Sequence, residues 1–416
     1  MSPRASRIAD ARLLGLLGLL YFAQGLPSGL LAKALPPLLR EQGVSLSAIG
    51  LTGLLAAPWA MKFLWAPLVE RTGTRRHWLL ALNAITLALM AALAMRDFSA
   101  WVGDAFVALL ILLFALNLVA ATQDVVTDGL AVSRLTASLR GIGNSLQVIG
   151  YKIGMTLGSA VLLWLVAHWG WSLAYAALAL LLVPVLCAAW LVAEPEPSRE
   201  EAASHPGWRG IHGYLHLLRD FAARPGLGWW LATVATFKIG DSLGSRMIGP
   251  LLSDRGLTLA EIGALTGLAS LVGLAGALLG GLVLLRLGHR NALLLFGSLQ
   301  ALGLAGYLPL ADGPQAPWLV AAVVCFEQFA DGLATVALFT LMMDACRASS
   351  PGVDYSVQAS LLVIVTGVAS LNSGLVADAL GYGAVLGGGA VLTMLALLPV
   401  LRYFHITAIA PTRTAG

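Results

Sequence analysis

The sequence PLLREQGVSLSAIG at residues 37–50 returns as PLLSDRGLTLAEIG at residues 250–263, which lie 213 positions further along the chain. The stretch RTGTR at residues 71–75 likewise matches RLGHR at residues 286–290, at an offset of 215. Two matches in the same order, with almost the same offset, indicate a duplicated structural unit rather than a chance similarity. The chain is therefore expected to contain two similar halves.

A third match lies further along each half, at an offset of 211. It pairs Ser145 with Ser356, Gln147 with Gln358, and Gly170 with Gly381. The repeat therefore extends through most of both halves.

Composition indicates which solvent surrounds these halves. Of the 416 residues, 58% are hydrophobic and only 11% are charged, and the mean hydropathy is +0.84. A soluble domain carries about 25% charged residues, so most of this chain is expected to lie in a lipid bilayer. The net charge of +4 comes mainly from basic residues in loops, which we attribute to membrane orientation and not to nucleic-acid binding.

A membrane-spanning helix needs about 20 predominantly apolar residues, and twelve stretches meet this requirement. We number them one to twelve: residues 13–39, 46–69, 78–95, 103–132, 142–166, 172–193, 227–252, 259–285, 292–311, 318–345, 355–377 and 384–404. One long polar stretch separates the sixth from the seventh. It divides the chain into an N-terminal six-helix bundle (1–193), a cytoplasmic linker (194–226) and a C-terminal six-helix bundle (227–416).

The orientation follows from the Lys and Arg residues between these stretches, because cytoplasmic loops carry an excess of them. With the N-terminus inside, 17 of the 25 lie in cytoplasmic segments and three in outer loops, and the other five lie within helices. Both termini are therefore expected in the cytoplasm. We call the helix ends that are expected on the cytoplasmic side the inner ends.

Six helices separate each pair of matches, so the two halves have the same orientation in the membrane. This arrangement resembles the major facilitator superfamily. The resemblance implies an all-α polytopic membrane protein with twelve transmembrane helices in two pseudo-symmetric six-helix bundles. It also implies a substrate site between the halves, near the middle of the bilayer.

The two short loops after helices two and eight resemble the facilitator loop signature, in which a glycine turn and basic residues brace the inner ends of helices. The expected gating residues are Lys62 on helix two and, in the loops, Glu70, Arg71, Gly73, Arg75, Arg286, Gly288 and Arg290. The second loop lacks an acid, since Leu285 aligns with Glu70.

Four other stretches resemble the AmpG-like permeases: YFAQGLP (21–27), KFLWAPL (62–68), ATQDVVTD (121–128) and FKIGD (237–241). This family includes muropeptide importers, acetyl-CoA transporters and siderophore permeases. MMDACR (342–347) and GVDYSVQ (352–358), with the absence of extra spans, look closest to the siderophore permeases of the RhtX/FptX type.

The resemblance implies proton-coupled import of a siderophore such as pyochelin, with or without iron, across the bacterial inner membrane. The alternatives are a muropeptide permease and, in another class, a membrane-embedded ligand sensor without transport. The seven histidines lie in loops or at helix ends, the three cysteines are dispersed, and no phosphate-binding Gly-Lys motif occurs. We therefore expect no enzyme, no cofactor, no metal site, and a monomer.

Ionised side chains within the apolar stretches are costly, so each needs a partner or a function. Lys33 and Arg246 superpose in the repeat and would suit an anionic substrate, although both are near enough to the outer surface to reach it. Lys152 is deeper and has no acid within one helical turn, so it is the best substrate-binding candidate. Lys238 is equally deep, and it either binds substrate or is neutralised by Asp241.

Acidic pairs occur on helices four and ten. Asp124 and Asp128 share one helix face, so they either take up a proton for coupling or form an ion pair with Lys62. Glu327 and Asp331 repeat this spacing and either carry a proton, together with Asp241, or pair with Arg246. Asp344 is near a helix end and is expected to be solvated or to cap the helix.

Other polar and aromatic residues face the bundle interior, because an amide in lipid needs a partner. Gln24, Gln147, Gln358, Tyr151 and Phe237 are candidates for the substrate site, although contacts between helices explain them equally well. The stretch GLPSG (25–29) is expected to weaken helix one, either as a hinge or as a static kink.

Overall fold

A computed structural model of the protein describes residues 3–44, 52–190, 210–257, 259–313 and 315–409. Within these ranges the regular structure is helical and contains no strand, which confirms the expected all-α class. Part of the first repeat, residues 45–50, and the bundle boundary expected at residues 193 and 194 lie outside the described residues.

The chain forms two compact units. The first unit comprises Met1–Leu135, Leu146–Ser204 and Cys346–Ser360, and the second comprises Thr136–Ser145, His205–Ala345 and Leu361–Gly416. Each unit thus combines most of one sequence half with a short segment of the other half. The two exchanged segments, 136–145 and 346–360, overlap when the repeat offset of 211 is applied.

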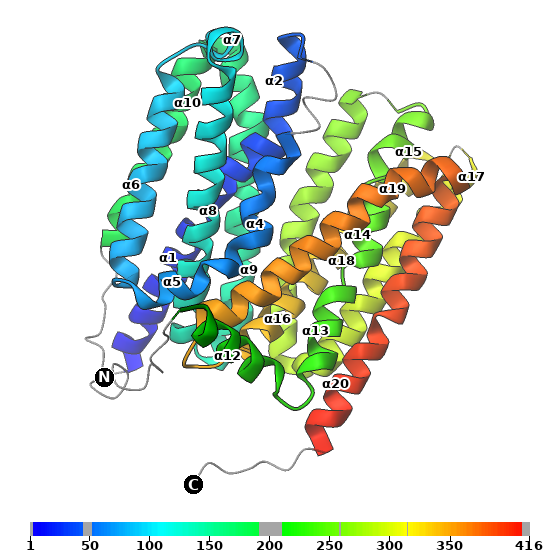
Figure 1. Ribbon diagram of the computed structural model, residues 1–416. Coiled ribbons are helices and arrows are strands. Elements are labelled where there is room, and N and C mark those ends of the chain that lie inside the picture. Colours follow the sequence, from blue (N-terminus) through cyan, green and yellow to red (C-terminus); the bar gives the residue numbers. More distant parts are fainter. Residues whose placement is uncertain (1–2, 45–51, 191–209, 258, 314, 410–416) are drawn as a thin grey trace. The chain divides into compact units, whose positions relative to one another are not determined.

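Long helices build most of the first unit, and α6 lies beside both α8 and α10 (Figure 1). The elements of this unit are α1 (Pro3–Gly29), η1 (Leu30–Ala34), α2 (Leu35–Glu41), η2 (Thr52–Ala56), α4 (Ala57–Met61), η3 (Lys62–Leu64), α5 (Ala66–Arg71), α6 (Arg75–Ala94), α7 (Phe98–Asp104), α8 (Phe106–Arg134), most of α9 (Ala137–Thr156), η4 (Leu157–Val161), α10 (Leu162–Trp190) and the start of α19 (Pro351–Leu395).

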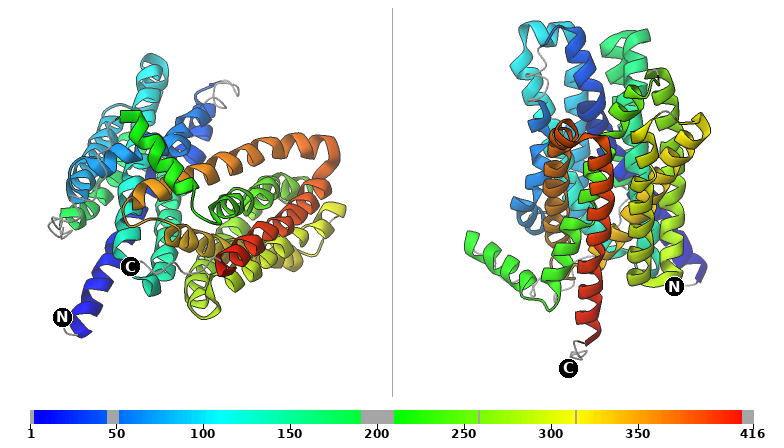
Figure 2. Two further views of the ribbon diagram at one scale, coloured as in Figure 1. Left: turned by 60° about the horizontal axis from the view of Figure 1, so that its bottom comes forward. Right: turned by 90° about the vertical axis from the view of Figure 1, so that its right-hand side faces the viewer.

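The second unit is centred on the packing of α16 against α18 (Figure 2). Its elements are the start of α9, then α12 (Gly210–Ala222), α13 (Leu227–Thr236), α14 (Ile239–Ser245), α15 (Ile248–Asp254), α16 (Leu259–Ala305), α17 (Leu308–Asp312), α18 (Pro317–Asp344), the rest of α19 and α20 (Leu397–Ile409).

Seven helical stretches of the described chain are long and apolar enough to cross a membrane. Three of them run over 54, 52 and 57 residues, and at about 1.5 Å per residue each is more than twice the thickness of a bilayer core. Each of these three turns at a single glycine of positive φ: Gly170, Gly288 or Gly381. These three stretches provide six crossings and the other four provide one each. The broken helices two and seven bring the total to twelve.

The glycine turns reproduce the sequence repeat in the backbone. Three pairs share positive φ values: Gly43 and Gly256 at 77° and 89°, Gly73 and Gly288 at 68° and 71°, and Gly170 and Gly381 at 78° and 80°. No described residue other than glycine has a positive φ, because a Cβ atom disfavours this conformation. The two six-helix bundles are therefore pseudo-symmetric, as the sequence predicts.

Helices two and seven, expected to be continuous, are broken in the structure. Helix two consists of η2, α4, η3 and α5, and Pro58 and Pro67 stand near the starts of its two α-helical pieces, because proline lacks the backbone donor of a helix interior. Helix seven consists of α13, α14 and α15, with its first break at Lys238. Breaks of this kind are found in transporters where surrounding protein satisfies the freed backbone groups.

Helices one and five pack backbone to backbone in the first unit. A Cβ atom at Gly25 would lie 2.3 Å from the Tyr151 carbonyl oxygen, and one at Gly154 would lie 2.1 Å from that of Phe22. Small residues permit such close approach in membrane proteins. The glycines expected to form a hinge are thus needed for contact, and α-helical geometry changes only beyond Gly29, in the π-helical segment η1.

Candidate transport site

A buried ion cluster lies in the first unit, where helix two meets α8. The Lys62 ammonium group forms ion pairs with the carboxylates of Asp124 and, at 3.7 Å, Asp128. The Tyr21 hydroxyl donates a 2.7 Å hydrogen bond to Asp128. Lys62 and Asp128 are no more than 2% exposed, so these groups must compensate one another's charge. We call Lys62, Asp124, Asp128 and Tyr21 the first cluster.

Three of the four stretches that suggested the family lie on α8 or on the two helices packed against it, and FKIGD (237–241) lies in the second unit. Three hydrogen bonds of 3.1 Å connect Gln24 with Thr127, Trp59 with Asn117, and Trp65 with Thr122, and the residue on α8 accepts each one. The Lys62 ammonium also lies 5.8 Å from the centre of the Trp59 ring, within the range of a cation–π interaction. Polar contacts therefore fix helices one and two against α8.

A second ion cluster lies in the second unit, at the first break in helix seven. The Lys238 ammonium lies 2.6 Å from the Asp331 carboxylate of α18 and 3.9 Å from that of Asp241. The Thr335 hydroxyl donates a 3.2 Å hydrogen bond to Asp331. The neutralisation of Lys238 by Asp241 expected from their spacing is present, but Asp331 is the closer partner. We call Lys238, Asp241, Asp331 and Glu327 the second cluster.

Glu327 differs from the other two acids of this cluster because no cation contacts it among the described residues. It is 1% exposed, and its Oε2 atom accepts a 2.9 Å hydrogen bond from the Gln328 amide. Its Oε1 atom makes no hydrogen bond within the described structure. The expected pairing of Glu327 and Asp331 with Arg246 is wrong, because Asp331 binds Lys238 and the Arg246 side chain is exposed.

The substrate-binding candidates fall into three groups by burial. Lys152 and Tyr151 are half-buried, and the Tyr151 ring meets the Trp59 ring edge-on at 6.2 Å, beside the first cluster. Lys33 and Arg246 are exposed, and Gln24, Gln147, Gln358 and Phe237 are buried. The Gln358 amide donates a 3.0 Å hydrogen bond to the Asp354 carbonyl of its own helix.

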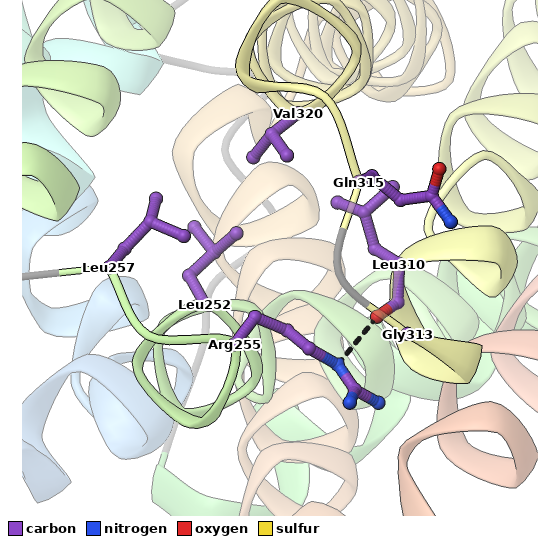
Figure 3. A pocket seen from close by; sticks show the side chains of 7 residues that line it. All are labelled: Leu252, Arg255, Leu257, Leu310, Gly313, Gln315 and Val320. Carbon is purple, nitrogen blue, oxygen red and sulfur yellow. Dashed lines mark hydrogen bonds between the residues drawn. The ribbon is translucent and has the colours of Figure 1, made fainter.

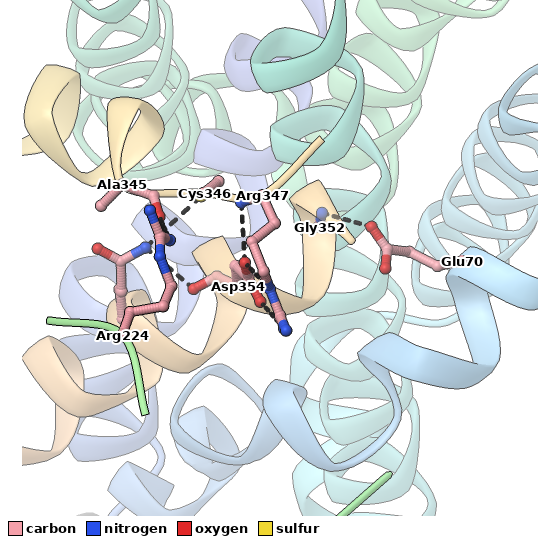
Figure 4. A network of polar contacts seen from close by, with 8 residues as sticks. Glu70, Arg224, Ala345, Cys346, Arg347, Gly352 and Asp354 are labelled. Atoms are coloured by element: carbon pink, nitrogen blue, oxygen red, sulfur yellow. Dashed lines mark hydrogen bonds and ion pairs between the residues drawn. The ribbon is translucent and has the colours of Figure 1, made fainter. Parts of the chain in front are cut away.

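At the inner ends of the first unit, Glu70 contacts the exchanged segment 346–360 (Figure 4). Its carboxylate accepts hydrogen bonds from the backbone N–H groups of Gly352 and Val353, in the first turn of α19. A carboxylate is favourable there because it meets free donors and the positive end of the helix dipole. Burial nevertheless raises the pKa of Glu70 to about 7, since desolvation outweighs these bonds.

Further contacts lie beside and within the same segment. The Arg75 guanidinium donates a 2.6 Å hydrogen bond to Ser133, and a Cβ atom at Gly129 would lie 3.4 Å from the Gly352 Cα. Arg347 and Asp354 form a 2.6 Å ion pair within the segment itself (Figure 4). The first loop therefore does contact helix ends, as the resemblance implies.

The other exchanged segment, 136–145, is held in the second unit. Arg140 forms an ion pair with Asp344 at the end of α18, and the His289 ring lies 2.6 Å from the same carboxylate. The expectation that Asp344 is solvated or only a cap is wrong, because these two partners occupy it. Gly288 provides the turn beside His289, whereas Arg286 and Arg290 are exposed.

The described part of the expected linker belongs to the second unit. It forms the amphipathic helix α12, of which Tyr214, Leu217 and Phe221 are buried. Shortly after this helix, the Arg224 guanidinium donates a hydrogen bond to the Ala345 carbonyl, where α18 ends (Figure 4). A cation is favourable at a helix C-terminus.

A small pocket lies in the second unit, near the loop between helices seven and eight. Its lining consists of Leu252, Arg255, Leu257, Leu310, Gly313, Gln315 and Val320 (Figure 3). Arg255 donates a 2.8 Å hydrogen bond to the Leu310 carbonyl. The cavity volume of about 40 Å³ suits a water molecule and is far too small for an organic substrate.

Comparison with known proteins decides the family. The sequence profile described as Major Facilitator Superfamily matches residues 17–360. The chain belongs to the Major Facilitator Superfamily. It is also 30% identical over 378 residues to an anhydromuropeptide permease of Escherichia coli (strain K12), a match that covers 88% of this chain and 74% of that protein.

A second relative supports the same group of transporters. The chain is 24% identical over 396 residues to a transporter of Rickettsia felis named AmpG 4, and this match covers 92% of this chain and 93% of the relative. The expected AmpG-like resemblance is therefore confirmed, and these relatives are transporters and permeases. The chain is a multi-pass membrane transporter.

Solved structures show the same fold. A superfamily transporter named FucP, in the outward conformation, matches with a TM-score of 0.70 at 13% identity over 94% of this chain and 98% of that chain. A bacterial homologue of the iron transporter ferroportin, in an outward-facing state, matches with a TM-score of 0.71 at 15% identity over 95% and 99%. At this identity the likeness concerns the fold alone.

Proposed function

We propose that this transporter imports an anhydromuropeptide, a sugar linked to a short peptide, by proton-coupled alternating access. The observation that supports the substrate class is the 30% identity to the anhydromuropeptide permease, which extends over 88% of this chain. It favours the muropeptide alternative over siderophore import.

The residues that suggested a siderophore permease form ion pairs and hydrogen bonds at helix ends. In the stretches 342–347 and 352–358, Arg347 pairs with Asp354, and the Gly352 backbone binds Glu70. Asp344 holds Arg140 and His289. These contacts at helix ends explain the residues of both stretches without a siderophore substrate.

Substrate recognition is assigned first to Lys152 and Tyr151. A muropeptide carries carboxylates on its peptide and an amphipathic sugar ring, which suit a cation beside an aromatic surface. Lys152 is half-buried next to Tyr151, and Tyr151 meets Trp59. Lys33 and Arg246 are exposed cations that we assign to attraction of the anionic substrate, and the buried Gln24, Gln147, Gln358, Lys238 and Phe237 to support of the site.

Proton coupling is assigned chiefly to Glu327. The second cluster contains three carboxylates and one ammonium, so full ionisation would leave an excess negative charge among buried and half-buried groups. Glu327 has no cation in contact among the described residues, and it is therefore the acid most readily neutralised by a proton. Asp331 and Asp241 adjust its charge through Lys238, and Asp124 and Asp128 act mainly as the partners of Lys62.

Alternating access requires that contacts at the inner ends break during the cycle. The residues assigned to this step are Glu70, Arg71, Gly73 and Arg75 in the first unit and Arg286, Gly288 and Arg290 in the second. The bond from Gly352 to Glu70 and the Arg140–Asp344 pair each connect residues of opposite sequence halves. Their rupture would free the exchanged segments and open the inner side.

The proposal is tested by uptake of radiolabelled anhydromuropeptide into cells that lack their own permease, with and without this protein. We expect accumulation that a protonophore abolishes and that labelled ferri-pyochelin does not inhibit. Accumulation of ferri-pyochelin alone would overturn the substrate assignment. Binding of muropeptide to the purified protein without any uptake would instead identify a sensor.

A further inference from the structure

Two polar side chains of helix nine are completely buried without hydrogen-bond partners. Gln300 and Tyr307 are both 0% exposed. Neither amide atom of Gln300, nor the Tyr307 hydroxyl, makes a hydrogen bond to another residue in the part of the chain that the structure describes. Buried polar groups are almost always hydrogen-bonded, so these atoms indicate a further partner.

The face of helix nine that carries Gln300 packs against helix seven. A Cβ atom at Gly297 would lie 3.1 Å from the Phe237 ring, and one at Gly244 would lie 2.8 Å from the Leu304 side chain. Gln300 lies between Gly297 and Leu304 on helix nine, and the corresponding stretch of helix seven, between Phe237 and Gly244, contains Asp241.

The same helix packs against Glu327. A Cβ atom at Gly303 would lie 3.0 Å from the Glu327 Cα and 3.3 Å from its Cβ. Gln300 and Tyr307 are three residues before and four residues after Gly303, so all three share this side of the helix. Tyr307 also belongs to the same buried hydrophobic cluster as Val324, which lies one helical turn before Glu327. The charges of Glu327 and Asp241 both act on the Tyr307 hydroxyl.

We propose that Gln300, Tyr307 and Glu327 form a buried proton-relay site in the second unit, which holds an ordered water molecule and carries the coupling proton. This inference rests on the proposed proton-coupled transport and names its ion site. Complete burial of all three side chains excludes the organic substrate from the site. A water molecule typically binds three polar groups, which matches the three side chains that carry the atoms left without partners in the described structure.

The Gln300 amide can form a hydrogen bond with either protonation state of Glu327. When Glu327 is ionised, it accepts hydrogen bonds from the Gln300 amide N–H, the Tyr307 hydroxyl or the bridging water. When it is protonated, its O–H donates to the Gln300 carbonyl oxygen or to the water. Gln300 and Tyr307 are thus positioning residues that stabilise each protonation state, and the proton itself resides on Glu327.

The other ionisable groups around Glu327 set the charge that the proton must balance. They are Lys238 and Asp241 from helix seven, Asp331 on the same helix, and Tyr307 from helix nine. Protonation of Glu327 removes one negative charge from this set, and Lys238 then faces only the charges of Asp241 and Asp331. Departure of the proton restores the excess charge, which makes the site responsive to the proton gradient.

The test uses the purified full chain in lipid and needs no substrate. Infrared difference spectra between high and low pH should show the C=O band of a protonated carboxylic acid that Glu327→Gln removes. Tyr307→Phe and Gln300→Leu should each shift this band, and should move its titration midpoint by about one pH unit, since tenfold changes in proton affinity correspond to single hydrogen bonds.

Tyr175→Phe is the matched control, because the Tyr175 hydroxyl is also buried without a hydrogen bond in the described structure, but in the first unit beside Trp171. It should leave the band and its midpoint unchanged. An unmoved band in both Tyr307→Phe and Gln300→Leu would overturn the relay site. A midpoint that depends on sodium concentration, in the wild type, would show a sodium site in its place.

Transport measurements separate this result from the proposed function. In proteoliposomes, Tyr307→Phe should shift the pH profile of proton-driven anhydromuropeptide uptake by about one unit and leave counterflow exchange unchanged. Absence of uptake in the wild type would refute the substrate assignment while the infrared result still stands. If the wild type takes up the substrate and Tyr307→Phe and Gln300→Leu show the same pH profile as the wild type, the relay site alone is refuted.

Discussion

The first and second clusters use the same buried groups in different proportions. In the first cluster both carboxylates reach the ammonium of Lys62, and Tyr21 adds a hydrogen bond to Asp128. In the second cluster Lys238 reaches Asp331 and Asp241, whereas Glu327 has only the Gln328 amide as a hydrogen-bonding partner among the described residues. The first cluster is thus more fully compensated than the second.

This difference separates stability from ion coupling. A buried ion pair is expensive to break when one partner is removed, whereas a buried acid without a cation is easily held neutral by a proton. Each lysine also lies at an interruption of its helix: Lys62 begins the 3₁₀ segment η3, and Lys238 precedes α14. The two units therefore use similar backbone breaks for different tasks.

The largest expected effect tests the first cluster. Lys62→Met should lower the free energy of unfolding by about 3–5 kcal/mol, because it leaves two buried carboxylates without their cation. Thermal unfolding of the purified protein in detergent measures the loss. Lys33→Met, at an exposed lysine, should stay within about 0.5 kcal/mol of the wild type.

Addition of Asp124→Asn to Lys62→Met should restore part of this stability, because one unpaired charge is removed. If the single variant Lys62→Met were as stable as the wild type, the first cluster would not be the structural element described above.

A smaller effect is expected at Lys152, the proposed substrate-binding lysine beside the first cluster. Lys152→Ala should reduce anhydromuropeptide uptake by about 10- to 100-fold, the value of one charge-assisted hydrogen bond, while protein in the membrane and its unfolding temperature stay constant. Lys152→Arg should retain part of the activity. Unchanged uptake in Lys152→Ala would remove this residue from the site.

The second cluster should show the opposite behaviour to the first. Glu327→Gln should leave stability unchanged or slightly higher, since the amide imitates the neutral acid, and should reduce proton-driven accumulation by at least about tenfold. Counterflow exchange, which needs no proton gradient, should persist. Asp331→Asn is the informative comparison, because it weakens the closest ion pair of Lys238 and should destabilise the protein.

The smallest effect concerns Glu70, outside both clusters. Its pKa is raised to about 7, so the folded state binds a proton more tightly than the unfolded state. The stability from this group is therefore present below about pH 4.5, the ordinary value, and is lost as the pH rises through about 7. The unfolding temperature of the wild type should fall between pH 5 and pH 8 by more than that of Glu70→Gln.

Asp104→Asn is a control for this comparison, because the Asp104 side chain is 82% exposed. It should follow the wild-type pH dependence. Parallel curves for the wild type and Glu70→Gln would contradict the assigned titration.

The sequence predicts the architecture because the internal repeat conserves recognisable residues at equivalent positions of the two halves. The glycines at the turns recur at the same offsets in sequence and in backbone conformation, so the repeat alone identifies Gly73 and Gly288 as equivalent positions. The breaks in helix two could have been anticipated from Pro58 and Pro67. Those in helix seven carry no such signal around Lys238, and the apolar run there reads as continuous.

Contacts between helices are harder to predict, because a sequence gives the depth of a residue in the membrane but not the direction of its side chain. Depth alone suggested Arg246 for Asp331, whereas the structure pairs Asp331 with Lys238. The partners of Glu70 are the backbone N–H groups of Gly352 and Val353, which no side-chain pattern can reveal. Gln300 carries the same signal as Gln24, an amide within an apolar stretch, and could have been found.

The most direct measurement is the proton flux that accompanies substrate entry. Proteoliposomes containing the wild-type protein are given anhydromuropeptide in a weakly buffered medium, and external pH is recorded while uptake of the label is followed. We predict alkalinisation of the medium with the wild type and none with Glu327→Gln, although both exchange the substrate. Entry of the substrate into wild-type vesicles without any proton movement would contradict the account.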